Sequence, residues 1–218
     1  MGGSRDRTST VSTRFSDASG VRTLAIETAS AACSVALIDD GTVVDWCHEI
    51  VCRGHAERLL PMVAGLRDGG RADRVIVDIG PGSFTGVRVG VAAARALGFA
   101  WGVPVTGYCS LALLAGIAGH SGEMLVAING GHGELFVGRY YGQPLDEIEP
   151  ARSLALSDAM LLTATHITGN AAHLITKTGS GEDIVADARA TTRLPHALTQ
   201  LAPAPFYGRP ADAKPMRQ

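Results

Sequence analysis

The sequence predicts an α/β protein built on a mixed sheet with flanking helices, and three observations lead to this prediction. Three strand-like stretches, 24–28, 33–38 and 42–50, follow one another with no helical pattern between them. Helical and strand patterns then alternate up to residue 118, which is typical of α/β proteins. Further strand-like stretches begin after residue 119, and they predict a second, smaller half.

In the first half, turn residues and apolar spacing determine the order of the elements. Asp39-Asp40-Gly41 lies between two apolar runs and predicts a hairpin, so the first three strands should form an antiparallel meander. The helical pattern at 55–66 contains Pro61, which a helix tolerates near its first turn. In order, we expect strands at 24–28, 33–38 and 42–50, a helix at 55–66, a strand at 74–79, a helix at 84–101, a strand at 103–106 and a helix at 110–118.

The second half shows shorter patterns. Strand-like stretches at 124–128 and 134–141 flank a Gly-rich segment and predict a hairpin. Ser157 is expected to cap a short helix over 158–162. The remaining expectations are a strand at 165–168, short helices at 171–176 and 195–201, and an irregular, Pro-rich tail from Ala202.

Composition excludes several classes of protein. The 218 residues carry a net charge of −2, so the bulk composition indicates neither a nucleic-acid-coating nor a membrane-surface protein. The four cysteines form no C-x-x-C pair, and reduced thiols in a cytoplasmic protein are expected. Residues 1–20 are polar and are expected to be a disordered leader or tag remnant. The apolar window 87–105 contains two arginines and a proline, which favours a buried helix over a membrane span.

The turn from Gly80 to Gly86 leads into the longest predicted helix. Ser83 is placed to cap that helix, and backbone N–H groups point to where an anion can sit. A dinucleotide fingerprint needs Gly at its sixth position, where Thr85 stands, and the Gly-Lys-Ser/Thr of a Walker A loop is absent. A sharp turn into a close-packed helix and an anion-binding loop therefore remain equal alternatives. The candidate phosphate-binding residues are Thr28, Gly80, Gly82, Ser83 and Thr85.

Small residues recur every four positions along the helix at 84–101, at Gly86, Gly90, Ala94 and Gly98. Such a stripe forms a shallow groove that lets another backbone approach closely. We expect either the helix at 55–66 or a partner subunit to cover it.

Catalytic groups are sparse in this sequence. The seven histidines include no pair at i, i+4 and no H-E-x-x-H order, and Ser83 lacks the G-x-S-x-G context of a hydrolase nucleophile. Glu27 and Asp78 end neighbouring predicted strands and could face one cleft, although solvation at strand ends explains this carboxylate pair equally well. We predict no catalytic residue, no metal ligand and no cofactor.

Several segments, taken together and in this order, resemble the bacterial TsaB family. The similar segments are 24–30, 33–37, 55–61, 80–90 and 205–215. The resemblance implies an actin-like fold of the sugar-kinase, Hsp70 and ribonuclease H-like type, with one subdomain at 21–118 and an abbreviated one at 119–218. It also implies a role in making N6-threonylcarbamoyladenosine next to the anticodon of tRNA.

In that family the protein is not the transferase. The resemblance implies that the chain pairs with a catalytic TsaD-like subunit and activates it, that a TsaE-like ATPase joins them, and that tRNA is reached through the complex. Alone, the chain is expected to form a homodimer, and no membrane association is implied.

The chain departs from the catalytic relatives at two places. TsaD-like proteins carry a His-x-x-x-His metal pair where this chain has Gly107 and Leu111, so no iron or zinc site is expected. Nucleotide-binding members of the fold carry Asp and Gly in the first phosphate hairpin, where this chain has Glu27 and side chains at 29–32 that hinder close approach of phosphate.

These observations leave one leading hypothesis, a non-catalytic partner subunit, and two alternatives. The first alternative is an ATP-dependent phosphotransferase that uses the turn at 80–86 for phosphate and Glu27 or Asp78 for Mg²⁺. The second, a residual metallopeptidase-like protein, lacks metal ligands. The predicted partner-interface residues are Leu59, Met62, Val63, Leu66, Gly86, Val87, Gly90, Val91, Ala94 and Arg95.

Overall fold

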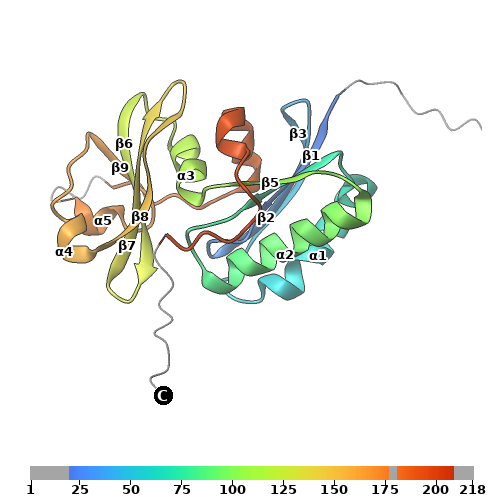
Figure 1. Cartoon of the computed structure of the whole chain (residues 1–218), viewed down its shortest axis with the longest axis horizontal. Helices are drawn as coiled ribbons and strands as arrows, with labels where there is room; N and C mark the ends of the chain where they lie inside the picture. The colour runs from blue at the N-terminus through green and yellow to red at the C-terminus, as the bar shows by residue number, and fades with distance from the viewer. Residues whose placement is uncertain (1–19, 177–180, 209–218) are drawn as a thin grey trace, which may run out of the picture.

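The structure is a computed structural model that describes residues 20–176 and 181–208. Its strands are β1 (Arg22–Glu27), β2 (Ala32–Asp39), β3 (Thr42–Ile50), β4 (Arg74–Asp78), β5 (Val105–Tyr108), β6 (Gly122–Gly131), β7 (Glu134–Gly142), β8 (Asp146–Ala155) and β9 (His166–Thr168). They form two sheets, in the orders β3-β2-β1-β4-β5 and β8-β7-β6-β9 (Figure 1). The expected leader at 1–20, except Gly20, and the end of the TsaB-like tail segment at 209–215 lie outside the described residues.

Helices separate and cover the two sheets. They are α1 (His55–Gly65), α2 (Phe84–Trp101), α3 (Ser110–Ala118), α4 (Leu156–Ala159) and α5 (Ala172–Ile175), with 3₁₀ turns η1 (Arg67–Gly70), η2 (Ala188–Arg193) and η3 (His196–Thr199). The first sheet packs α1 and α2 on its outer face, and α3 lies between the sheets (Figure 1). The second sheet packs α4 and α5 on its outer face. This layered arrangement confirms the predicted α/β class with a mixed sheet and flanking helices.

The first sheet follows the predicted order of elements. Strands β1, β2 and β3 are antiparallel neighbours, and β4 and β5 run parallel to β1. The hairpin turn falls at Asp40 and Gly41, which both have positive φ. Ser83 caps α2 as expected, because its Oγ accepts a hydrogen bond from the N–H of Gly86 at 3.2 Å.

The strand β8 was not among the predicted elements. Its sequence is rich in charged residues and contains Pro150, which cannot donate to a sheet ladder. The strand nevertheless forms because it lies at the edge of the second sheet, where one side needs no ladder hydrogen bonds. The register with β7 also shifts between Val137 and Arg139, opposite this proline.

Three shorter predictions are corrected in position or type. Strand β5 begins at Val105, two residues later than expected. Helix α4 has Ala155 rather than Ser157 at its N-cap, with no side-chain cap hydrogen bond. The predicted helix at 195–201 is the 3₁₀ turn η3, since the segment is short and begins with Pro195 at its N-cap.

The last described segment, 182–208, returns from the second sheet to the first. A division of the chain into two subdomains at residue 118 does not include this crossing. The N–H of Ala188 donates to Ser34 Oγ at 3.1 Å, and Leu201 pairs with Gly107 at the edge of β5. The N–H of Ser153 then donates to the carbonyl of Gly208 at 2.9 Å, back on the second sheet. This segment therefore ties both sheets together. Among the described residues, no helix is both long enough and apolar enough to cross a bilayer.

Candidate functional site

A cleft opens at the carboxyl ends of β1 and β4, the neighbouring parallel strands in the first sheet. The chain leaves β1 toward β2 and leaves β4 toward α2 and β5, so the two connections diverge to opposite sides of the sheet. Open α/β sheets bind ligands at such points of divergence. The cavity has a volume of about 450 Å³, which is within the usual range for small-molecule sites.

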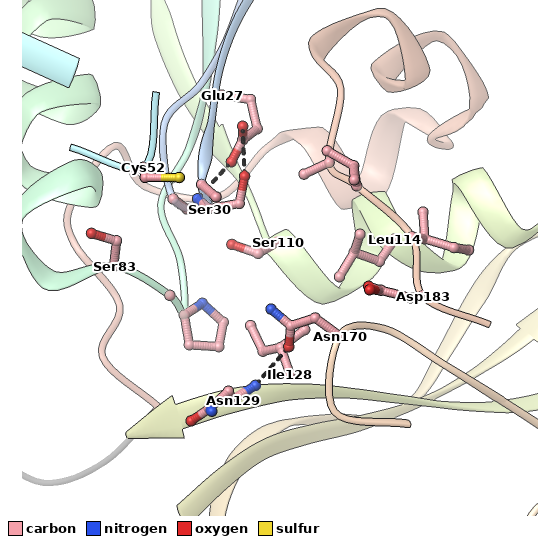
Figure 2. A pocket seen from close by; sticks show the side chains of 17 residues that line it. Glu27, Ser30, Cys52, Ser83, Ser110, Leu114, Ile128, Asn129, Asn170 and Asp183 are labelled. Carbon is pink, nitrogen blue, oxygen red and sulfur yellow. Dashed lines mark hydrogen bonds between the residues drawn. The ribbon is translucent and has the colours of Figure 1, made fainter. Parts of the chain in front are cut away.

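The cleft has one wall from each sheet, as Figure 2 shows. The loops after β1 and β4 and helix α3 form the first wall, while β6, the turn after β9 and the segment 183–186 form the second. The lining residues are Glu27, Ala29, Ser30, Ala31, Cys52, Pro81, Gly82, Ser83, Ser110, Leu114, Ile128, Asn129, Asn170, Asp183, Ile184, Val185 and Ala186.

Glu27 ends β1 and organises the loop that follows it. Its two carboxyl oxygens accept hydrogen bonds from the N–H of Ser30 at 3.0 Å and from the Ser30 hydroxyl at 3.2 Å (Figure 2). Burial raises the pKa of the Glu27 carboxyl well above its usual range, and the nearby Asp78 carboxyl raises it further, while the hydrogen bonds from Ser30 oppose the shift. The floor of the cleft is therefore a buried carboxyl that favours its neutral form.

Asp78 ends β4 and organises the loop that follows it, as Glu27 does for the loop after β1. Its Oδ1 accepts hydrogen bonds from the N–H of Gly80 at 2.7 Å and from the Ser110 hydroxyl at 2.6 Å, which holds the turn against the start of α3. Its Oδ2 is buried and makes no hydrogen bond to another described residue. Burial raises the pKa of Asp78 to about 7, although both hydrogen bonds lower it. The predicted pair of carboxyls thus lies at one end of the sheet, and both groups support cleft loops.

The hydrogen bonds of the turn bear on the predicted phosphate site. Ser83 donates its N–H to the carbonyl of Ala29 at 2.7 Å, and the buried Thr28 hydroxyl donates to the carbonyl of Gly86 at 2.8 Å. These groups dock α2 on the loop after β1, which favours the alternative of a sharp structural turn. Of the five candidate residues, Gly82 and Ser83 line the cleft, whereas Thr28, Gly80 and Thr85 do not. Phosphate binding by the turn stays a prediction.

The small-residue stripe of α2 faces the interior of the chain. A Cβ added at Gly86 would stand less than 3.0 Å from the carbonyl oxygen of Thr28, and one at Gly98 would meet Val105 Cγ2 equally closely. The stripe therefore packs against the backbone of the loop after β1 and against the side chain of Val105 in β5. These contacts, and not α1, fill the groove at Gly86 and Gly98, whereas contact of α2 with a partner subunit stays a prediction.

The same orientation determines how the predicted interface residues lie within the chain. Nine of the ten have their side chains or Cα atoms buried in the first sheet's core, and Arg95 is exposed. The nine buried residues are Leu59, Met62, Val63, Leu66, Gly86, Val87, Gly90, Val91 and Ala94. Each packs toward the strands within this chain, and their role in a partner interface stays a prediction. An interface formed by the opposite faces of α1 and α2 stays a prediction.

The exposed face of α2 carries aromatic and basic side chains. The Arg88 guanidinium lies 3.4 Å from the centre of the Phe84 ring, and its Nε donates a hydrogen bond to the Tyr207 hydroxyl at 2.8 Å. This contact fixes the last described segment to the first turns of α2. Farther along, Arg95 is exposed and Phe99 is 91% exposed.

Metal binding has no support among the described residues, which contain no group of three or more His, Cys, Asp or Glu side chains placed to hold an ion. Gly107 ends up beside Ile79 and Ala202, and Leu111 is fully buried in the core between the sheets. No sequence pattern indicated the second cleft wall, since Asn129, Asn170 and Asp183 come from separate segments of the second half. The Gly-rich turn after Asn129 was the one local signal near it.

Comparison with known proteins shows that this chain is similar to members of one protein family. The sequence profile of the family described as TsaD, tRNA N6-adenosine threonylcarbamoyltransferase, matches residues 48–209. The tRNA threonylcarbamoyladenosine biosynthesis protein TsaB of Escherichia coli is 37% identical over 128 residues, and that of Bacillus subtilis is 29% identical over 143 residues. These alignments cover 55% and 62% of both partners, respectively. The chain thus spans little more than half the length of the curated relatives it matches.

Solved structures show the same likeness over more of the chain. YeaZ from Pseudomonas aeruginosa superposes with a TM-score of 0.69 at 26% identity, covering 79% of this chain and 89% of that one. A Pseudomonas aeruginosa protein described as similar to peptidase YEAZ gives a TM-score of 0.70 at 25% identity, covering 87% and 100%.

Proposed function

The chain belongs to the TsaD family as a TsaB-type member with an actin-like fold, and we propose that it is a non-catalytic subunit in the biosynthesis of N6-threonylcarbamoyladenosine in tRNA. In this proposal it pairs with a TsaD-like transferase and activates it. A TsaE-like ATPase joins the pair, tRNA is contacted through the complex, and the isolated chain forms a homodimer in the cytoplasm.

One observation carries the pairing part of this proposal, the exposed outer face of α1 and α2. It combines bulky apolar side chains with arginine, the composition enriched in protein interfaces. The exposed residues of these two helices include Leu60, Pro61, Ala64, Phe84, Arg88, Ala92, Arg95, Ala96 and Phe99, beside the polar side chains of Glu57, Arg58 and Thr85. Phe99 is 91% exposed on a regular helix, so burial of its ring against another protein would remove a large apolar surface from water.

The substitution Phe99→Glu tests the proposal without disturbing the core, since Phe99 makes little contact within the chain. We expect it to abolish co-elution with a TsaD-like subunit and to lower threonylcarbamoyl transfer to tRNA in a reconstituted system with TsaE and threonylcarbamoyl-adenylate. Burying a charge in place of an aromatic anchor costs at least about 2 kcal/mol, or roughly thirtyfold in affinity.

The chain offers a matched control in Leu161→Glu. Leu161 is 80% exposed and follows α4, on the outer side of the second sheet. This variant should pair and support transfer as the parent chain does. Unchanged pairing of the Phe99→Glu chain, or equal transfer with the chain left out, would refute the proposed role. Val91 is unsuitable for this test because it is 3% exposed, so a charge there would unfold the core.

A further inference from the structure

The chemistry of the cleft at the ends of β1 and β4 indicates what kind of molecule it can hold. Among its seventeen lining residues there is no Lys, Arg or His, while Glu27 and Asp183 supply two carboxyl groups. Sites for phosphate and carboxylate ligands use basic side chains or free backbone N–H groups. The cleft offers no basic side chain to an anion, and the N–H groups of Ser30 and Ser83 are already engaged in loop hydrogen bonds.

Two of the remaining polar groups, on Ser110 and Asp183, are acceptors. Ser110 donates its hydroxyl hydrogen to Asp78, so it offers lone pairs to a neighbouring molecule. Asp183 lies at the mouth of the cleft, is exposed, and has no hydrogen bond or ion pair to any other described residue. Figure 2 shows its carboxylate beside Asn170, on the wall opposite Glu27 and Ser30. A molecule in the cavity therefore meets acceptors on both walls.

Apolar side chains complete the lining. Leu114 of α3 and Ile128, Ile184 and Val185 of the second wall lie between the polar groups, and Val185 is 53% exposed. An inorganic cation gains nothing from such surfaces, and the described residues hold no group of ligands suited to a metal. An organic cation with an apolar body matches both kinds of lining.

We propose that this cleft is a binding site for a small organic cation of the amine or amidine class, whose charged end meets the Asp183 carboxylate and the Ser110 oxygen and whose apolar part packs on Leu114 and Ile184. This inference goes beyond the proposed function, because pairing through α1 and α2 uses another face of the chain.

Three probes of nearly equal shape and different charge test the proposal on the full chain. Benzamidine is a cation, benzamide is neutral and benzoate is an anion. Amide chemical-shift titrations by NMR should show benzamidine shifting the resonances of Ser30, Ser110 and Asn129, benzamide shifting them more weakly, and benzoate leaving them unchanged. Asp183→Asn should weaken benzamidine binding about fivefold, as expected for loss of one partly exposed ion pair.

The control variant is Asp158→Asn, which removes the same charge from an exposed position on α4, outside the cleft. It should leave the benzamidine affinity unchanged. The proposal is overturned if benzoate or inorganic phosphate shifts the cleft resonances as strongly as benzamidine. It is also overturned if none of the probes shifts them, or if both asparagine variants weaken binding equally.

Discussion

Gly90 lies in the middle of α2, where an alanine would ordinarily stabilise the helix. Alanine is favoured over glycine by about 1 kcal/mol in a helix interior. In this chain, however, a Cβ at position 90 would stand less than 3.0 Å from Thr28 Oγ1 and 3.4 Å from Val77 Cγ2. We therefore expect Gly90→Ala to destabilise the protein, against the intrinsic helix preference.

The magnitude follows from the two opposing effects. Overpacking a well-filled site costs about 1–3 kcal/mol, and the gain in helix preference offsets about 1 kcal/mol of it. The net loss in the free energy of unfolding should be about 1 kcal/mol. Because the offending atom is a side-chain oxygen, Thr28→Ala should relieve the clash, although it also removes the hydrogen bond to Gly86. The double variant should then be more stable than the sum of the single changes predicts, by about 1 kcal/mol.

Urea unfolding followed by circular dichroism measures these differences. Gly65→Ala is the matched control, because Gly65 ends α1 and an added Cβ there meets nothing within 4 Å. The control should be as stable as the parent or more so, by up to about 1 kcal/mol. If Gly90→Ala behaved like this control, or if the double variant were strictly additive, close packing of α2 on the loop after β1 would not be what requires glycine here.

Two further predictions concern titratable groups. The pKa of Asp78 is raised in the folded chain, so its contribution to stability is full below about pH 4 and is lost as the pH rises toward and through about 7. In urea unfolding curves measured from pH 4 to 8, the variant Asp78→Asn should show a smaller decline in stability. An unchanged decline would contradict the assignment of this pH dependence to Asp78. Among the four cysteines, Cys52 is exposed, whereas burial raises the pKa of Cys33 and of Cys109 to about 12. A thiol reagent at pH 8 should therefore modify Cys52 quickly and the two buried thiols only on unfolding, and equal rates in the Cys52→Ser variant and the parent would refute this.

The sequence by itself determined the elements whose signals are local. The Asp-Asp-Gly turn fixed the first hairpin, Ser83 fixed the start of α2, and apolar periodicity fixed α1 and β4, because each signal acts within a few residues of the element it specifies. The carboxyl pair Glu27 and Asp78 was also placed correctly, since parallel neighbouring strands end at the same edge of a sheet.

Tertiary structure decided the features that depend on distant segments. A four-residue repeat of small residues has the same pattern whether it meets a sheet, a helix or another chain, so only the fold could show that Gly86 and Gly90 meet the loop at Thr28. The edge position that allows Pro150 in β8 is likewise a property of the whole sheet. The cleft places Asp183 on the wall opposite Glu27, more than half of the chain away in sequence, and no local pattern encodes such an arrangement.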